Sequence, residues 1–224
     1  IFIVPSILFL HFRGLSFNTY LKLNLSVYIK GVLAIFIMAL AMIPVANFLG
    51  ALNAMLPLPE FLSFLKEIEA QTLLITEQFL VMDTPIDLFL MLGLIGFIAA
   101  VGEELLFRGV LQNLFQEWFG SPHIAIWLTA FLFSVIHLQY HAVLPRFVLG
   151  ALIGYVYVNS GSLRSAMLLH FFYNSTLVLL TFFIQHGGLD ASWEEVGAEG
   201  LMLALISVLV LGVLLLRRIP KIGT

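Results

Sequence analysis

The sequence predicts an all-α, polytopic membrane protein: a transmembrane bundle of about seven to eight helices around an internal polar cavity, with an amphipathic helix at the interface. Composition is the first observation behind this prediction. Of 224 residues, 61% are hydrophobic and 10% are charged, and the mean hydropathy is +1.07, which is outside the usual range of water-soluble domains. The second is that the apolar residues gather in separate runs of membrane-spanning length.

Each apolar run is interpreted as one span, because a spanning helix needs about 20 mostly apolar residues. Residues 1–12 have the composition of the remainder of a span. Further spans are expected in order at residues 26–50, 85–102, 122–138, 144–159, 162–185 and 199–216. Several are shorter than the ideal length, which suits a bundle that thins the bilayer or tilts little around a polar centre.

Residues 60–83 differ from the spans. Apolar side chains such as Phe64, Leu65 and Ile68 recur at helical spacing, but Lys66 and Glu69 interrupt them. We expect an amphipathic helix or helix pair at the membrane interface. It would either pack on the bundle or act as a lid over a substrate site.

The chain is expected to form one structural domain. Residues 1–84 supply the N-terminal helices and the interfacial segment, residues 85–185 the catalytic helical core, and residues 186–224 the C-terminal loop and last helix. Lys and Arg concentrate in cytoplasmic loops, and one predicted side carries Arg13, Lys22, Lys30, Arg164, Arg217, Arg218 and Lys221. The C-terminus is therefore expected in the cytoplasm, and the acidic segment 186–198 on the opposite side.

Charge and cysteine content exclude several functions. The formal net charge of −3 and the pI near 6.1 provide no basic surface for a phosphate backbone, so the bilayer is an expected partner and nucleic acid is not. Without cysteine there is no disulfide, thiolate nucleophile or cysteine metal site. Any chemistry must come from carboxylate, imidazole and amide groups.

Three pairs of side chains, each four residues apart, interrupt the apolar runs. Residues at this spacing share one face of a helix. The pairs are Glu104 with Arg108, Phe133 with His137, and His170 with Asn174. A charge near the bilayer centre costs about 2.5–3.5 kcal/mol on insertion scales, so such groups normally face the bundle interior. We expect three helices to direct them into one cavity.

Glu103 and Glu104 are adjacent and therefore lie on different faces of their helix. Glu104 has the spacing to pair with Arg108, which leaves Glu103 free to act as a base whose strength desolvation increases. A water molecule held between Glu103 and His137 would be activated as a nucleophile. Arg146, in contrast, lies near a predicted helix end and is expected at the membrane interface.

A second helix would complete a site for amide hydrolysis without a covalent intermediate. His170 and Asn174 supply hydrogen-bond donors suited to the oxyanion that develops on an attacked carbonyl. The helix that carries Glu103 is expected to run toward the cytoplasm, so the reaction would occur in the cytoplasmic half of the membrane.

The motifs Glu-Glu-x-x-x-Arg at 103–108, Phe-x-x-x-His at 133–137 and His-x-x-x-Asn at 170–174 resemble a known set in order and spacing. They are similar to those of the CAAX prenyl endopeptidase and bacteriocin-processing (CPBP) intramembrane proteases, over about residues 85–180. Eukaryotic members of that family remove the last three residues from prenylated CAAX proteins. Bacterial members are linked to bacteriocin processing or self-immunity.

The resemblance implies an intramembrane endopeptidase acting on a peptide or protein, with a lipidated C-terminus as one option. It also implies a role for each motif residue. Glu103 and His137 would activate water, His170 and Asn174 would stabilise the oxyanion, Glu104 and Arg108 would orient the site, and Phe133 would shape the substrate pocket beside His137.

Alternatives to metal-free hydrolysis remain open. Glu103, His137 and His170 would also make a plausible zinc set with an open position for water. However, the chain has no His-Glu-x-x-His motif, so its spacing requires no metal and no cofactor is expected. A proton-coupled transporter could use the same three residues as a relay, although no convincing internal repeat is found. An immunity or scaffold protein could keep the fold and bind a partner helix.

Overall fold

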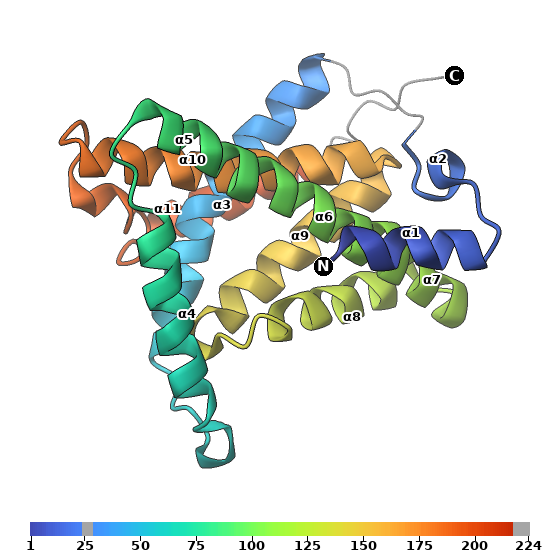
Figure 1. Ribbon diagram of the computed structural model, residues 1–224, viewed down its shortest axis with the longest axis horizontal. Helices are drawn as coiled ribbons and strands as arrows, with labels where there is room; N and C mark the ends of the chain where they lie inside the picture. The colour runs from blue at the N-terminus through green and yellow to red at the C-terminus, as the bar shows by residue number, and fades with distance from the viewer. Residues whose placement is uncertain (24–28, 217–224) are drawn as a thin grey trace.

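The computed structural model describes residues 1–23 and 29–216, and within them the chain is helical without a strand (Figure 1). In the described part of the chain, four helical stretches are long and apolar enough to cross a membrane: α3 (Ile29–Ala54), Pro85–Phe119, Tyr140–Ser160 with α9 (Val143–Ser160), and α10 (Leu163–Gln185). The same residues include three shorter apolar helices: α1 (Ile3–Phe12), α8 (Pro122–Val135) and α11 (Leu201–Leu216). The predicted all-α membrane bundle is confirmed. The first residues of the predicted span 26–50, and Arg217, Arg218 and Lys221, lie outside the described residues.

The predicted span 85–102 is too short. The helix begins at α5 (Pro85–Met91), where Thr84 and Asp87 form a capping box, and ends before Gly120, whose φ of 66° suits a helix C-terminus. Between them lie η2 (Leu92–Ala99), α6 (Ala100–Glu104), η3 (Leu105–Gln112) and α7 (Asn113–Phe119), where η2 and η3 are π-helical. The helix continues past the charged residues because they find partners inside the bundle.

α4 (Leu65–Phe79) is the expected amphipathic helix and projects from the bundle after the short η1 (Glu60–Leu62) (Figure 1). Only Leu65 and Glu69 are buried in it. Glu69 accepts a hydrogen bond from the backbone N–H of His141 at 3.1 Å, and its other oxygen lies 2.9 Å from His141 Nδ1. Exposed apolar side chains such as Leu73 fit a helix at the membrane interface.

Two glycines on α9 allow the neighbouring helices to approach closely. A Cβ at Gly150 would lie 3.2 Å from the Phe133 ring of α8, and one at Gly154 would lie 2.9 Å from Gln112 Oε1 of η3. Small residues at this spacing are a frequent means of helix association in membranes. The close contact brings α8, α9 and η3 together around the motif residues.

The bundle has two ends with different loops. At one, called here the Arg13 end, Arg13 at the end of α1 pairs with Glu117 of α7 at 3.2 Å. The Glu194 end comprises residues 55–84, 136–142 and 186–200. There Asn53 donates to the Tyr140 carbonyl at 2.9 Å and Gln185 to the Leu80 carbonyl at 2.8 Å.

The connection between α10 and α11 includes η5 (Ala191–Trp193) and folds onto α3. Asn47 of α3 donates to the carbonyls of Glu194 at 2.7 Å and Val196 at 3.1 Å. Gly197 has a φ of +93°, and a Cβ there would lie 2.6 Å from Pro44 Cα. Glycine is therefore required both for the backbone conformation and for the close approach to α3.

Gly197→Ala should lower the melting temperature in detergent, because it combines a left-handed backbone strain of about 1–2 kcal/mol with a backbone overlap. Gly187→Ala is the matched control, since Gly187 has a φ of +70° but a Cβ there would have nothing within 4 Å. Equal losses of melting temperature in the two variants would mean that the loop does not depend on its contact with Pro44.

Candidate active site

The Glu104 carboxylate lies at the centre of the buried polar cluster. Its Oε1 accepts a hydrogen bond from Arg108 Nη1 at 2.7 Å and lies 2.8 Å from His170 Nδ1 on α10. Arg108 Nη2 donates to the Gly150 carbonyl of α9 at 2.7 Å. Glu104 and Arg108 are both fully buried. The structure thus brings the expected pair together and connects it to two further helices.

Burial of these charges in a bilayer is tolerable only with good partners, because the loss of hydration costs several kcal/mol per ion. Arg108 also lies over the Phe133 ring, with 4.9 Å between the guanidinium carbon and the ring centroid. The π-helical η3 starts directly after Glu104, and π-helical turns are frequent at functional sites.

Glu103 differs from Glu104 in its surroundings. Its side chain keeps 14% exposure and lines a cavity, whereas Glu104 is sealed. Glu103 Oε2 lies 3.9 Å from His170 Nε2. The His170 ring therefore lies between two carboxylates, with Glu104 at Nδ1 and Glu103 at Nε2.

His137 follows the last turn of α8 and lines the same cavity. Its Nδ1 lies 2.7 Å from the Phe133 carbonyl oxygen, an acceptor that assigns the proton to Nδ1 and leaves Nε2 as an acceptor in the neutral ring. The Phe133 ring contacts the rings of both His137 and His170 edge to face, at centroid distances of 5.1 and 6.1 Å. Phe133 is thus the apolar wall between the two histidines.

Asn174 lies one turn beyond His170 on α10 and also lines the cavity. Its Nδ2 donates to the Ile95 carbonyl of η2 at 3.0 Å. A side-chain amide has two N–H donors, so one stays available for a ligand.

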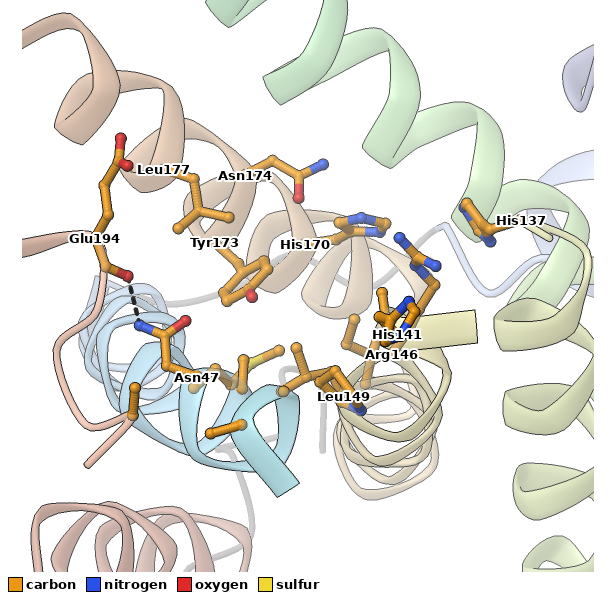
Figure 2. Close-up of a pocket in the computed structure, with 18 of the residues that line it drawn as sticks. Asn47, His137, His141, Arg146, Leu149, His170, Tyr173, Asn174, Leu177 and Glu194 are labelled. Carbon is orange, nitrogen blue, oxygen red and sulfur yellow. Dashed lines mark hydrogen bonds between the residues drawn. The ribbon is translucent and has the colours of Figure 1, made fainter. Parts of the chain in front are cut away.

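The cavity has a volume of about 880 Å³, which is within the range of ligand pockets and ample for several peptide residues. Figure 2 shows His137, His170 and Asn174 around it, with Tyr173 between the histidines and Glu194. Its exposed lining residues are Ala54, His141, Leu177, Glu194, Glu195 and Glu199. All except Leu177 of α10 lie at or directly beside the Glu194 end. The cavity therefore opens at that end.

Arg146, which is expected at the membrane interface, also lines the cavity, and its Nη2 donates to Gln139 Oε1 at 2.6 Å. Its position three residues after the start of α9 resembles that of an interfacial anchor. No pattern local to Arg146 in the sequence reveals that its side chain lines the cavity.

The alternative zinc set requires at least three side chains that converge on one metal ion. Among the described residues, no group of three or more His, Asp or Glu side chains is arranged to hold a metal ion. His170 contacts Glu104 with one ring nitrogen and approaches Glu103 with the other. Among the described residues, Glu103, His137 and His170 are therefore not arranged as a zinc site.

The fold and the cluster together define a polytopic helical membrane protein with a polar site buried among its spans. A family model described as "Type II CAAX prenyl endopeptidase Rce1-like" matches residues 85–176. This segment contains all three motifs, so the match supports the resemblance to the CPBP family that the motifs predict. It also supports an intramembrane protease of CAAX type as the general class of this protein. No curated protein and no solved structure gave a match.

Glu104→Gln should destabilise the protein strongly, because it leaves the Arg108 guanidinium buried without its counter-ion. Loss of one partner of a buried pair typically costs about 3–5 kcal/mol. The exposed Arg13–Glu117 pair provides the control, and Arg13→Gln should change the free energy of unfolding by about 0–1 kcal/mol. Unfolding in mixed detergent micelles measures both. Similar small changes would show that the buried pair does not hold the bundle together.

Proposed function

We propose that the protein is an intramembrane endopeptidase of CAAX type that hydrolyses a peptide bond with water activated by Glu103 and His137. One observation carries the proposal: of two adjacent carboxylates, Glu104 is sealed by Arg108 and His170, while Glu103 faces a cavity that it shares with His137. A buried carboxylate whose oxygen is held by an arginine and a histidine does not accept a proton from water readily. A neighbour that is partly desolvated and open to water can.

In the proposed reaction, Glu103 accepts a proton from the attacking water, and His137 Nε2 orients that water or shares the proton. The water oxygen forms a bond to the peptide carbonyl carbon, and the carbonyl oxygen becomes an oxyanion. When the tetrahedral intermediate collapses, the carbon–nitrogen bond breaks and the proton is returned to the leaving amine. The products are a carboxylate and an amine, and no covalent enzyme intermediate forms.

The oxyanion would receive hydrogen bonds from α10. Asn174 contributes the N–H that Ile95 does not use, and His170 contributes Nε2–H when its ring carries both protons. Glu104 and Arg108 would be positioning residues. Glu104 fixes the His170 ring through its contact with Nδ1, and Arg108 fixes the Glu104 carboxylate by a hydrogen bond. Phe133 would fix the separation of the two histidines and form one wall of the substrate pocket.

The proposed substrate is a peptide or protein segment that enters from the Glu194 end. Arg13, Lys22, Lys30 and Arg164 lie toward the opposite end, so the tendency of basic residues to remain in the cytoplasm favours a cytoplasmic Arg13 end and C-terminus. The opening of the cavity would then face away from the cytoplasm. This differs from the cytoplasmic depth expected from the sequence, because the helix carrying Glu103 continues to Phe119 and leaves Glu103 near its middle.

Glu103→Gln should lower kcat for cleavage of a quenched peptide panel by at least about 100-fold, the usual contribution of a general base. The melting temperature should stay close to that of the wild type, since Glu103 makes no hydrogen bond that the fold requires. Glu117→Gln, at the Arg13 end, is the matched control and should retain activity.

A chelator should leave wild-type cleavage unchanged. Full activity of Glu103→Gln would exclude Glu103 as the base, and loss of cleavage in chelator with recovery on adding zinc would favour the metalloprotease alternative. Proton-coupled transport in proteoliposomes, without any cleavage, would favour the transporter.

The orientation can be measured without background because the chain has no cysteine. In intact cells, a membrane-impermeant maleimide should label Glu195→Cys at the cavity opening. Thr19→Cys at the Arg13 end should react only after permeabilisation. Both positions are exposed. The reverse pattern would place the cavity opening in the cytoplasm.

A further inference from the structure

Arg146 is a second guanidinium in the cavity, and the motifs do not include it. It extends from the first turn of α9 toward the space that His137 and His170 border (Figure 2). A guanidinium has five N–H donors. One hydrogen bond of this side chain joins Nη2 to Gln139 Oε1, and Nη1 is buried without a partner.

The partners of Arg146 differ sharply from those of Arg108. Arg108 has the Glu104 carboxylate at 2.7 Å and the Gly150 carbonyl at 2.7 Å. Arg146 attracts Glu103 across the cavity, but in the described part of the chain no carboxylate forms an ion pair with it within 4.0 Å. A guanidinium that is mostly buried in a membrane protein without a counter-ion is costly, and such residues usually mark ligand sites.

We propose that Arg146 is a substrate-binding residue that binds the C-terminal carboxylate of the peptide, an inference that rests on the proposed peptidase function. The planar guanidinium matches a carboxylate with two parallel N–H···O bonds, and this match is stronger in a cavity that excludes water. The hydrogen bond to Gln139 restrains Arg146 Nη2. The N–H donors of Arg146 that have no protein partner would bind the carboxylate of the peptide. Binding the chain end at Arg146 positions a bond near that end beside Glu103 and His137.

A carboxylate and a lipid phosphate share the same anionic chemistry, so the test must separate them. The probes are two fluorescein-labelled peptides of one sequence with an aliphatic C-terminal tripeptide, one ending in a free carboxylate and the other in a carboxamide. Cleavage is measured with wild type, Arg146→Gln and Arg146→Lys. Arg164→Gln is the control, since Arg164 is exposed at the opposite end of the bundle.

Wild type should cleave the carboxylate peptide with a kcat/KM at least about tenfold above that of the carboxamide. Arg146→Gln should remove this preference, mainly by raising KM for the carboxylate peptide, and should lower cleavage of the carboxamide far less. Arg146→Lys should recover part of the preference, because lysine keeps the positive charge but lacks the two parallel N–H donors of a guanidinium. Arg164→Gln should behave as wild type.

Equal cleavage of both peptides by wild type would overturn the proposal while leaving the peptidase function intact. If Arg146→Gln lost cleavage of the two peptides to the same extent, the proposal would also be overturned. A structural role of Arg146, or a contact with the oxyanion, would affect both peptides equally.

Binding measured by fluorescence anisotropy decides the case in which wild type cleaves neither peptide or Arg146→Gln loses its fold. Tighter binding of the carboxylate peptide to wild type, with a smaller preference in Arg146→Lys and none in a folded Arg146→Gln, would support the carboxylate site even if the peptidase function failed. Binding of neither peptide, or equal binding of both to wild type with displacement by short-chain phosphatidylglycerol, would overturn it. The latter result would assign the guanidinium to a lipid headgroup.

Discussion

The bundle depends on one carboxylate oxygen. Glu104 Oε1 contacts both Arg108 Nη1 and His170 Nδ1, and Arg108 continues the network to the Gly150 carbonyl. Three spans are therefore held at a common depth: Pro85–Phe119, α9 and α10. Water cannot replace these partners inside a bilayer, so the network constrains the helices more strongly than the same contacts would at an aqueous surface.

The same constraint separates the two adjacent glutamates. Because Glu104 must face Arg108 and His170, helix geometry turns Glu103 about 100° away, toward the cavity. His170 then lies between the sealed carboxylate and the open one, at 2.8 Å and 3.9 Å respectively. The Glu104–Arg108 pair can thus fix the orientation of the neighbouring Glu103 carboxylate, which faces the cavity. The polar cluster combines structural and candidate catalytic residues in a single network, so substitutions in it should be judged by fold and activity together.

The sequence was most informative where a contact follows from helix periodicity. The Glu104–Arg108 contact is of this kind, because the two residues share a helix face. It was least informative for contacts between distant segments. Glu69 lies 72 residues from His141, and neither residue has a local pattern that predicts their contact. The hydropathy of the sequence also placed the end of the predicted span just before Glu103. A hydropathy scale gives each charged residue its cost in lipid and takes no account of a partner that offsets this cost.

Arg108 and Arg146 illustrate how the partners of a charged group distinguish a structural role from a binding role in a membrane protein. Hydropathy assigns Arg108 and Arg146 the same penalty, yet Arg108 has a carboxylate, a carbonyl and an aromatic ring, whereas Arg146 has one neutral amide oxygen. A guanidinium whose charge is neutralised by a carboxylate of the protein stabilises the fold and attracts an anionic ligand only weakly. A guanidinium without a counter-ion lowers the stability of the free protein, and a bound anionic ligand would restore that stability. The arginine with fewer partners is therefore the one where ligand binding gains most.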